Sequence, residues 1–252
     1  TATITVNASG QNDAPTAADN TVTTNEDTNH TFAASEFNFT DVDGDSLDHI
    51  SIETLPSNGT LLLSGNAVSA GDQISVANIS NLVFRPVANA NGDDYDTFTF
   101  SVNDGTVDSG TYTMTIDVTA VNDAPLATDD ADAVNEDATI TESSGSELLV
   151  ADDTDTDGNT LTVTQIAITG GSNSSVTSST TYSNGTSITG TYGTLTVGAN
   201  GSYTYVADQS ASDDLDASDL ATDSFTYTIA DGTTTDTATL IITVTGINDV
   251  PT

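Results

Sequence analysis

The sequence predicts an all-β protein made of two tandem β-sandwich domains joined end to end. The first observation is an alternation of apolar and polar residues, which is typical of a strand with one buried face. In residues 111–119 the apolar face consists of Tyr112, Met114, Ile116 and Val118. Residues 97–102 and 225–229 alternate in the same way. The second observation is that no long segment has a helical period; only residues 211–221 could form a helix, of about one turn at most.

The third observation is an internal repeat, which sets the domain boundaries. The motif Asn12-Asp13-Ala14-Pro15 recurs at residues 122–125 and, as Asn-Asp-Val-Pro, at residues 248–251. An alternating strand precedes every copy. We therefore predict a closing strand of a preceding repeat at residues 1–10, a first domain at 11–121, a second domain at 122–250, and the start of the next linker at 251–252. Each domain would hold seven or more short strands between turn signals, as in a β-sandwich.

The charge balance excludes several classes of function. The chain carries 38 aspartate and glutamate residues against a single cation, Arg85, and its formal net charge is −37. Binding to nucleic acid and docking on anionic lipid both depend on Lys and Arg, so neither is expected. No apolar run approaches the roughly 18 residues of a membrane span, so direct membrane insertion is not expected either. The absence of cysteine removes disulfides and thiolate-bound metals.

The residues of known catalytic motifs are also missing, and we expect no enzyme. The sequence contains no Trp that could form a platform for sugars, no nucleophile elbow and no phosphate-binding loop. His30 and His49 are isolated from each other in the sequence, and two lone histidines do not make a zinc site. We interpret both as ordinary strand or surface residues.

Several motifs recur in the same order in both domains. Asn25-Glu26-Asp27 returns at residues 135–137, the loop Asp41-Val42-Asp43-Gly44 returns at 155–158, and the strand from Phe98 to Asp104-Gly105 returns at 225–232. On these motifs the first domain resembles a bacterial cadherin-like repeat. The second domain, with Tyr-Gly-Thr-Leu-Thr-Val at 192–197 and Gly-Ser-Tyr-Thr-Tyr at 201–205, resembles a VCBS repeat. Both families occur in tandem in large secreted, calcium-dependent adhesins of Gram-negative bacteria, often of the RTX type.

The resemblance implies Ig-like/cadherin-like sandwiches with Ca²⁺ at the junctions between repeats. For the junction inside this chain it implies the ligands Glu26, Asp94, Asp96, Asn122, Asp123, Asp155, Asp157 and Asp231. For the two outer junctions it implies Asn12, Asp13, Asp41, Asp43 and Asp104 at one end, and Glu136, Asp223, Asn248 and Asp249 at the other. The sequence departs from the family pattern at one place, because Asp94-Tyr95-Asp96, and Asp223 alone, replace an Asp-x-Glu motif.

The repeated Asp-x-Asp-Gly loop has two readings. Ca²⁺ takes 6–8 oxygen ligands, and aspartates two residues apart in a loop with glycine can turn both carboxylates inward. The same loop is by default a β-turn with Asx hydrogen bonds; its recurrence at matching places favours calcium. Residues 153–158 also match the opening of an EF-hand loop, but Thr164 stands where the bidentate glutamate belongs, so we reject that interpretation.

Two functions follow from these features. The favoured one is a calcium-rigidified spacer in a large secreted adhesin at the bacterial cell surface, which projects a distal binding region for cell adhesion and biofilm formation. The alternative is a module that binds a sugar, peptide or host protein through residues 170–191, a Ser/Thr/Gly-rich insertion that forms a long hairpin or a mobile loop. The expected partners are neighbouring repeats of the same chain and a surface or glycan ligand of the parent adhesin, with the chain itself monomeric.

Overall fold

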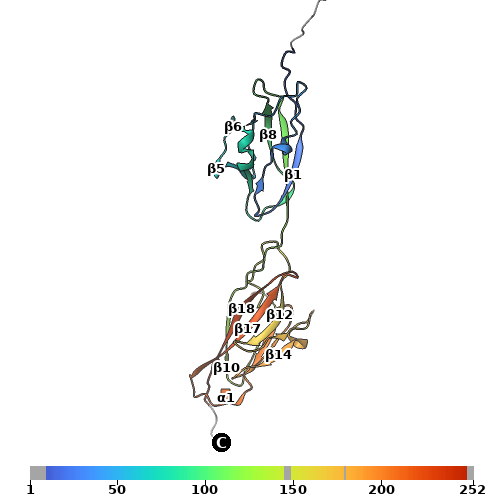
Figure 1. Ribbon diagram of the computed structural model, residues 1–252. Helices are drawn as coiled ribbons and strands as arrows, with labels where there is room; N and C mark the ends of the chain where they lie inside the picture. Colours follow the sequence, from blue (N-terminus) through green and yellow to red (C-terminus); the bar gives the residue numbers. More distant parts are fainter. Residues whose placement is uncertain (1–9, 145–148, 179, 249–252) are drawn as a thin grey trace, which may run out of the picture. The chain divides into compact units, whose positions relative to one another are not determined.

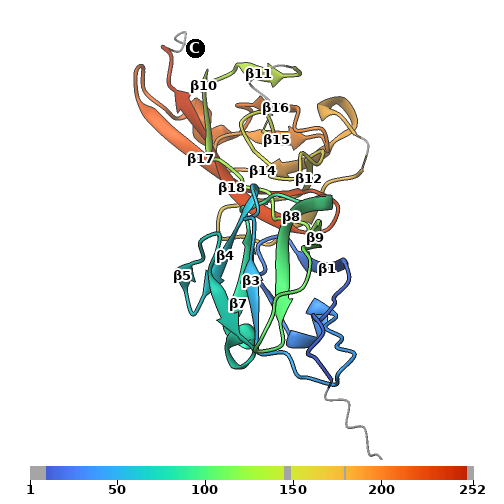
Figure 2. The same ribbon diagram turned by 90° about the horizontal axis from the view of Figure 1, so that it is seen from above.

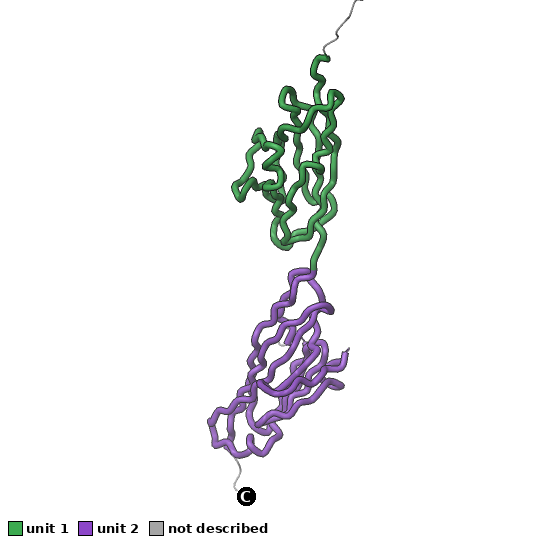
Figure 3. Tube along the Cα trace, in the orientation of Figure 1, with its two compact units in different colours: residues 1–121 green, residues 122–252 purple. Residues whose placement is uncertain are grey.

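The computed structural model describes residues 10–144, 149–178 and 180–248. It divides the chain into two compact units, Thr1–Val121 and Asn122–Thr252 (Figure 3). The strand predicted at residues 1–10 lies outside the described residues except for Gly10, and the linker predicted at 251–252 lies outside them entirely.

The first unit is a sandwich of two sheets (Figure 1). The larger sheet has the order β1-β9-β8-β3-β6, in which β1 pairs parallel with β9 and the other pairs are antiparallel. The smaller sheet has the order β2-β7-β4-β5. The elements are β1 (Asn20–Asn25), β2 (His30–Thr31), η1 (Ala34–Phe37), β3 (His49–Ile52), β4 (Gly59–Leu63), β5 (Asn66–Ala67), β6 (Gln73–Ser75), η2 (Val76–Asn81), β7 (Leu82–Pro86), β8 (Gly92–Asn103) and β9 (Tyr112–Thr119).

Aromatic side chains fill the core between these sheets. The alternation predicted for β8 is confirmed, because Phe98, Phe100 and Val102 are fully buried. Phe37 meets Phe100 edge to face with ring centroids 4.9 Å apart, a favoured geometry for aromatic pairs. In β9, Met114, Ile116 and Val118 are buried as predicted.

The second unit repeats this architecture. Its larger sheet has the order β10-β18-β17-β12-β13, again with the first pair parallel, and its smaller sheet has the order β11-β16-β15-β14 (Figure 2). The elements are β10 (Asp130–Asn135), β11 (Thr139–Glu142), β12 (Thr162–Ile168), β13 (Ser174–Ser175), η4 (Tyr182–Asn184), β14 (Thr186–Thr189), β15 (Thr194–Val197), β16 (Tyr203–Val206), α1 (Ser210–Asp213), β17 (Leu220–Ala230) and β18 (Thr235–Thr245). The predicted all-β fold of two Ig-like sandwiches is confirmed, and α1 is the single turn expected near residues 211–221.

The insertion at residues 170–191 is part of this second sandwich. Its described residues add β13 to the edge of the larger sheet and β14 to the edge of the smaller one, where β14 pairs antiparallel with β15. Val176 and Thr180 are buried. The two short strands lie in different sheets, so the segment crosses between the layers instead of forming one long hairpin.

Candidate metal centres

A tight loop places two aspartates at the N-terminal end of the second unit. Gly158, with φ of +73°, donates its N–H to the carbonyl oxygen of Asp155 at 3.1 Å. Asp155 Oδ1 accepts the N–H of Asn159 at 3.0 Å, and Asp157 Oδ2 accepts the N–H of Asp123 at 2.7 Å. The loop is therefore a β-turn that also bonds to the Asp155 side chain, and its second aspartate holds the connector residue Asp123.

The carboxylate of Asp231 joins the same cluster. Its Oδ2 accepts the side-chain amide of Asn122 at 2.8 Å, and its Oδ1 accepts the N–H groups of Thr233 and Thr234 at 2.6 and 2.7 Å. These bonds hold the pKa of Asp231 well below its usual range; the Asn122 amide has the largest effect, and the backbone donors have the next largest. Asn122 also donates to the carbonyl oxygen of Asp123 at 2.7 Å. Five residues predicted as ligands, Asn122, Asp123, Asp155, Asp157 and Asp231, thus share one network.

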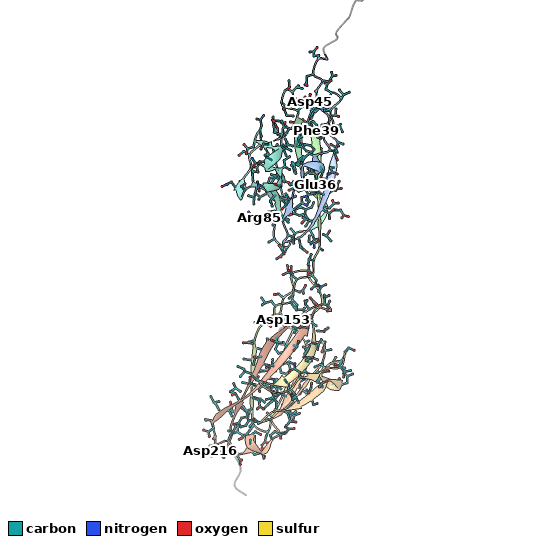
Figure 4. The ribbon with its side chains drawn as sticks, in the orientation of Figure 1. Glu36, Phe39, Asp45, Arg85, Asp153 and Asp216 are labelled. Carbon is teal, nitrogen blue, oxygen red and sulfur yellow. The ribbon has the colours of Figure 1, made fainter. Side chains whose placement is uncertain are left out.

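The N-terminal end of the first unit contains the same network. Asn12 Nδ2 donates to Asp104 Oδ2 at 2.9 Å, which is the main reason that the pKa of Asp104 is lowered. Asp43 Oδ2 accepts the N–H of Asp13 at 2.7 Å, and Asp41 Oδ1 accepts the N–H of Asp43 at 2.8 Å. Figure 4 shows Asp45, the last residue of this loop, at the end of the unit where the described chain begins. The repetition follows the individual contacts as well as the sequence motif.

A carboxylate oxygen at the same place in each network has no hydrogen-bond partner within the described chain. Asp41 Oδ2 and Asp155 Oδ2, which occupy equivalent positions, are shielded from solvent and accept no hydrogen bond. A desolvated carboxylate oxygen without a donor is costly, and a bound cation would remove that cost. The polar atoms around these two oxygens include carboxylate and carbonyl oxygens, which are the ligands that Ca²⁺ prefers. Among the described residues, however, no three acidic or histidine side chains converge closely enough to hold an ion by themselves. The residues fit calcium in type and charge but need further ligands.

A buried glutamate marks the opposite end of each unit. Glu26 is 3% exposed; its Oε1 accepts the N–H of Val121 at 2.6 Å, and its Oε2 accepts the side-chain amide of Asn91 at 3.0 Å. Glu136 is 1% exposed, and its Oε1 accepts the N–H of Ile247 at 2.5 Å. Glu136 Oε2 has no hydrogen-bond partner among the described residues. Each glutamate therefore holds the residue where the chain leaves its sandwich.

Asp96 and Asp223 each bind backbone donors of a neighbouring loop. Asp96 accepts the backbone N–H groups of Ser57, Asn58 and Thr97 at 3.0, 2.6 and 2.8 Å. Backbone donors therefore surround this buried carboxylate, and we interpret it as a loop anchor. Asp94 is exposed, adopts φ of +48° and lies in the register shift of β8, where its N–H donates to Asp117. Among the described residues, no hydrogen bond joins Asp94 or Asp96 to Glu26.

Asp223 is the equivalent anchor of the second unit. It is 4% exposed, and it accepts the N–H groups of Thr191, Tyr192 and Gly193 at 2.7, 3.0 and 3.1 Å. The hydroxyl of Tyr205 donates to the same carboxylate at 2.7 Å. Burial, followed by this bond, raises the pKa of Tyr205. Asp223 therefore holds the loop before β15 and has no oxygen without a donor.

The remaining predicted residues have simpler outcomes. Asn248 is the last described residue, and Asp249 lies outside the described part of the chain. Thr164 lies in β12 and donates its hydroxyl to the carbonyl oxygen of Thr228, so a strand follows the Asp-rich loop where an EF-hand would have a helix. His30 and His49 contact single acids, Glu36 and Asp48.

Sequence reasoning missed an acidic group beside the Asp155 loop. Asp153 Oδ1 accepts the N–H of Thr128 at 2.8 Å, and Asp236 Oδ2 accepts the N–H of Ala127 at 2.9 Å. Burial raises the pKa of Asp153 to about 6. Figure 4 shows Asp153 at the end of the second unit and Phe39, its counterpart two residues before Asp41, in the first. The first unit has Phe39 where the second has Asp153, within otherwise matching motifs, and this difference was the sequence signal that could have indicated the acidic group.

Comparison with known families agrees with this architecture. Residues 122–246 match the family described as bacterial cadherin-like domain, and residues 12–118 match the bacterial Ig domain. The chain belongs to the bacterial cadherin-like and Ig-type tandem repeats. Domains of this type suggest an extracellular surface protein, and cadherin-like domains are typically calcium-binding. The VCBS assignment of the second domain stays a prediction.

The chain also matches solved structures at low sequence identity. An endo-fucoidan hydrolase of glycoside hydrolase family 107 is 18% identical, with a TM-score of 0.30 and 92% of this chain covered; this chain spans 29% of that one. Human protocadherin-24 EC1-2 is 14% identical, with a TM-score of 0.45, 91% of this chain covered and 95% of that chain. No curated protein matches the chain. No helix of the described residues is long and apolar enough to cross a membrane.

Proposed function

We propose that the chain is a calcium-rigidified pair of spacer repeats in a large secreted bacterial adhesin, which projects a distal binding region for cell adhesion and biofilm formation. The observation that carries the proposal is the repeated cluster of carboxylates with an unpartnered inner oxygen, at Asp41 in one unit and Asp155 in the other. Two equivalent carboxylate oxygens that lack a donor at equivalent places indicate a recurring cation. An extracellular location would support calcium as the ion, because extracellular modules bind Ca²⁺ with dissociation constants of about 10⁻⁴–10⁻³ M.

The residues that would hold the ion come from both sides of the connector. Asp155, Asp157, Asp231 and Asp123 supply carboxylates, and the carbonyl oxygen of Asn122 is a further ligand. Glu26 supplies the acid from the preceding repeat; it already binds Val121, which directly precedes Asn122 in the chain. When bound, the cation would offset the mutual repulsion of these acids. The proposed result is a stiff connector.

We propose no catalytic role for these two repeats. Amide and backbone donors lower the pKa of Asp104 and Asp231 and so stabilise the ionised forms of these two acids, whereas a general acid needs a raised pKa. The proposed partners are neighbouring repeats of the same chain, and the ligand of the parent adhesin is proposed to bind elsewhere. The insertion at 170–191 stays the site of the alternative function; a glycan array with the intact chain and with a variant trimmed at 172–187 would test it.

Calcium is expected to control the stiffness of the connector. Small-angle scattering of the 252-residue chain should give a single extended maximum dimension with millimolar Ca²⁺ and a broader distribution with chelator. Asp157→Ala removes one ligand and the bond to the N–H of Asp123, so it should broaden the distribution even with Ca²⁺.

Asp43→Ala is the matched control for this experiment. It removes the equivalent bond to the N–H of Asp13, but it acts in the network of Asn12 and Asp13 and not in that of the connector residues Asn122 and Asp123. Its scattering profile should match that of the unchanged chain with and without Ca²⁺. A profile that does not respond to Ca²⁺, or an equal effect of both substitutions, would contradict the proposed function.

A further inference from the structure

The hydroxyl of Tyr227 lies between two hydrogen-bond acceptors. Its oxygen is 2.7 Å from the carbonyl oxygen of Thr128 and 2.7 Å from Asp130 Oδ2. A phenol carries one proton, so it donates fully to only one acceptor at a time. When Asp130 is ionised, the Tyr227 oxygen therefore lies 2.7 Å from one acceptor, either the Thr128 carbonyl oxygen or Asp130 Oδ2, without a full hydrogen bond to it. Because Tyr227 is fully buried, water cannot compensate on the tyrosine side.

A second proton satisfies all three oxygens. We propose that Asp130 is a proton-binding site of the second unit. Its carboxylate takes a proton from water, the new Oδ2–H donates to Tyr227 Oη, and the tyrosine proton donates to the carbonyl oxygen of Thr128. No bond between heavy atoms forms or breaks, and the net change is one proton bound.

The charges around Asp130 favour the protonated form. Asp129 precedes it in the chain, and Asp152 and Asp153 face it from the segment before the Asp155 loop. Tyr227 on β17 is its hydrogen-bond donor, and Tyr203 on β16 is also close enough to interact. Burial, together with these three aspartates and against the tyrosine bond, raises the pKa of Asp130 to about 6. The second unit contains no Lys or Arg that could balance these acids, since the single arginine of the chain, Arg85, belongs to the first unit.

The first unit lacks both the carboxyl group and the tyrosine hydroxyl of this arrangement. Asn20 and Asp130 are equivalent, since each opens the strand that pairs parallel with the closing strand. Phe100 and Tyr227 are equivalent, since they occupy the same place in the strand before the closing one. Asn20 donates its amide to the carbonyl oxygen of Glu36, and Phe100 has no hydroxyl. The proton-binding site is therefore a property of the second repeat alone.

The raised pKa fixes the direction of the pH dependence. The folded state binds the proton more tightly than the unfolded chain, in which an aspartate has a pKa of about 3.9. Stability contributed by this group is therefore greatest below pH 4 and is lost as the pH rises from about 4 to about 6. Because Asp130 is only half-buried, we expect the folding equilibrium constant of the second unit to change by about 10-fold over this window.

Carbon-13 NMR of the full chain in chelator tests the site directly. The carboxyl carbon of Asp130 should titrate with a midpoint of about pH 5–6, the lower value matching the roughly 10-fold change in the folding equilibrium constant. Asp153→Asn removes a facing charge and should lower this midpoint. Tyr203→Phe removes no charge and should lower it less. A midpoint near pH 4 in the unchanged chain would overturn the proposal, whether or not any variant folds.

Stability measurements supply the second test. Asp130→Asn keeps the shape of the protonated acid, and its amide can donate to Tyr227 Oη, so the fall in stability between pH 4 and 6 should be smaller than in the unchanged chain by the same factor of about 10. Asp132→Asn is the matched control: it also removes one charge beside a tyrosine hydroxyl, but within the described part of the chain the hydroxyl of Tyr203 has a single acceptor, Asp132 Oδ2, at 3.0 Å. Asp132→Asn should leave the pH dependence unchanged. Identical pH dependence in Asp130→Asn and Asp132→Asn would overturn the proposal.

Discussion

Millimolar Ca²⁺ is expected to raise the melting temperature of the chain by about 10 °C. An ion that binds only the folded state stabilises it by about 2.7 kcal/mol per site when its concentration is about 100 times the Kd. With a Kd of about 10⁻⁴ M, which suits an extracellular module, 10 mM Ca²⁺ meets this condition. Such a gain is large beside the stability of a typical small domain, about 5 kcal/mol. The gain matters in this chain, because 38 acidic side chains repel one another and a single arginine balances them.

Ionic strength is the necessary control for this measurement. Any salt weakens the repulsion among the acids, so NaCl and Mg²⁺ at matched ionic strength should each raise the melting temperature somewhat. Mg²⁺ dehydrates reluctantly and suits a wide site with many carboxylates poorly. Differential scanning calorimetry should therefore show a much larger rise with Ca²⁺ than with either control. An equal rise in NaCl would mean that general charge relief explains the effect and specific sites do not.

Replacing Asp223 by alanine is expected to destabilise the second unit by about 3–5 kcal/mol, the range for breaking a buried charged network. The substitution leaves three backbone N–H groups and the hydroxyl of Tyr205 without their acceptor. The fit of the loop leaves little room for rearrangement, since a Cβ on Gly190 would lie 2.3 Å from Asp223 Oδ2. Chemical unfolding of the full chain, monitored through the transition of the second unit, measures the loss in its free energy of unfolding.

The medium of that experiment separates the two roles of Asp223. An anchor is needed with or without metal, so the full loss should persist in chelator. A metal ligand would matter only with Ca²⁺, and a loss that disappears in chelator would refute the anchoring role. Asp219→Ala is the matched control, because Asp219 is an exposed aspartate close to the start of the same strand. We expect it to change stability by about 0.5 kcal/mol or less.

Local patterns were enough to predict the fold and part of each candidate site. Alternation along β8 and β9 predicted which side chains are buried, because neighbouring residues of a strand point to opposite faces. The repeated Asn-Asp and Asp-x-Asp-Gly motifs predicted residues that do lie in one network, such as Asp123 and Asp157. Both motifs are short, and their geometry depends on residues close in sequence and on turns that Gly158 allows through its positive φ.

The sequence by itself therefore determined the two sandwiches, their strand faces and the position of the acidic turns. Only the tertiary structure decided what each carboxylate does there. Asp223 and Asp231 look equally suited to calcium in the sequence, yet the first is surrounded by donors from residues 191–193 and from Tyr205. Asp130 meets Tyr227 across 97 residues of chain. The charge state and partners of a carboxylate depend on burial and on donors brought from distant segments, and a local pattern carries neither.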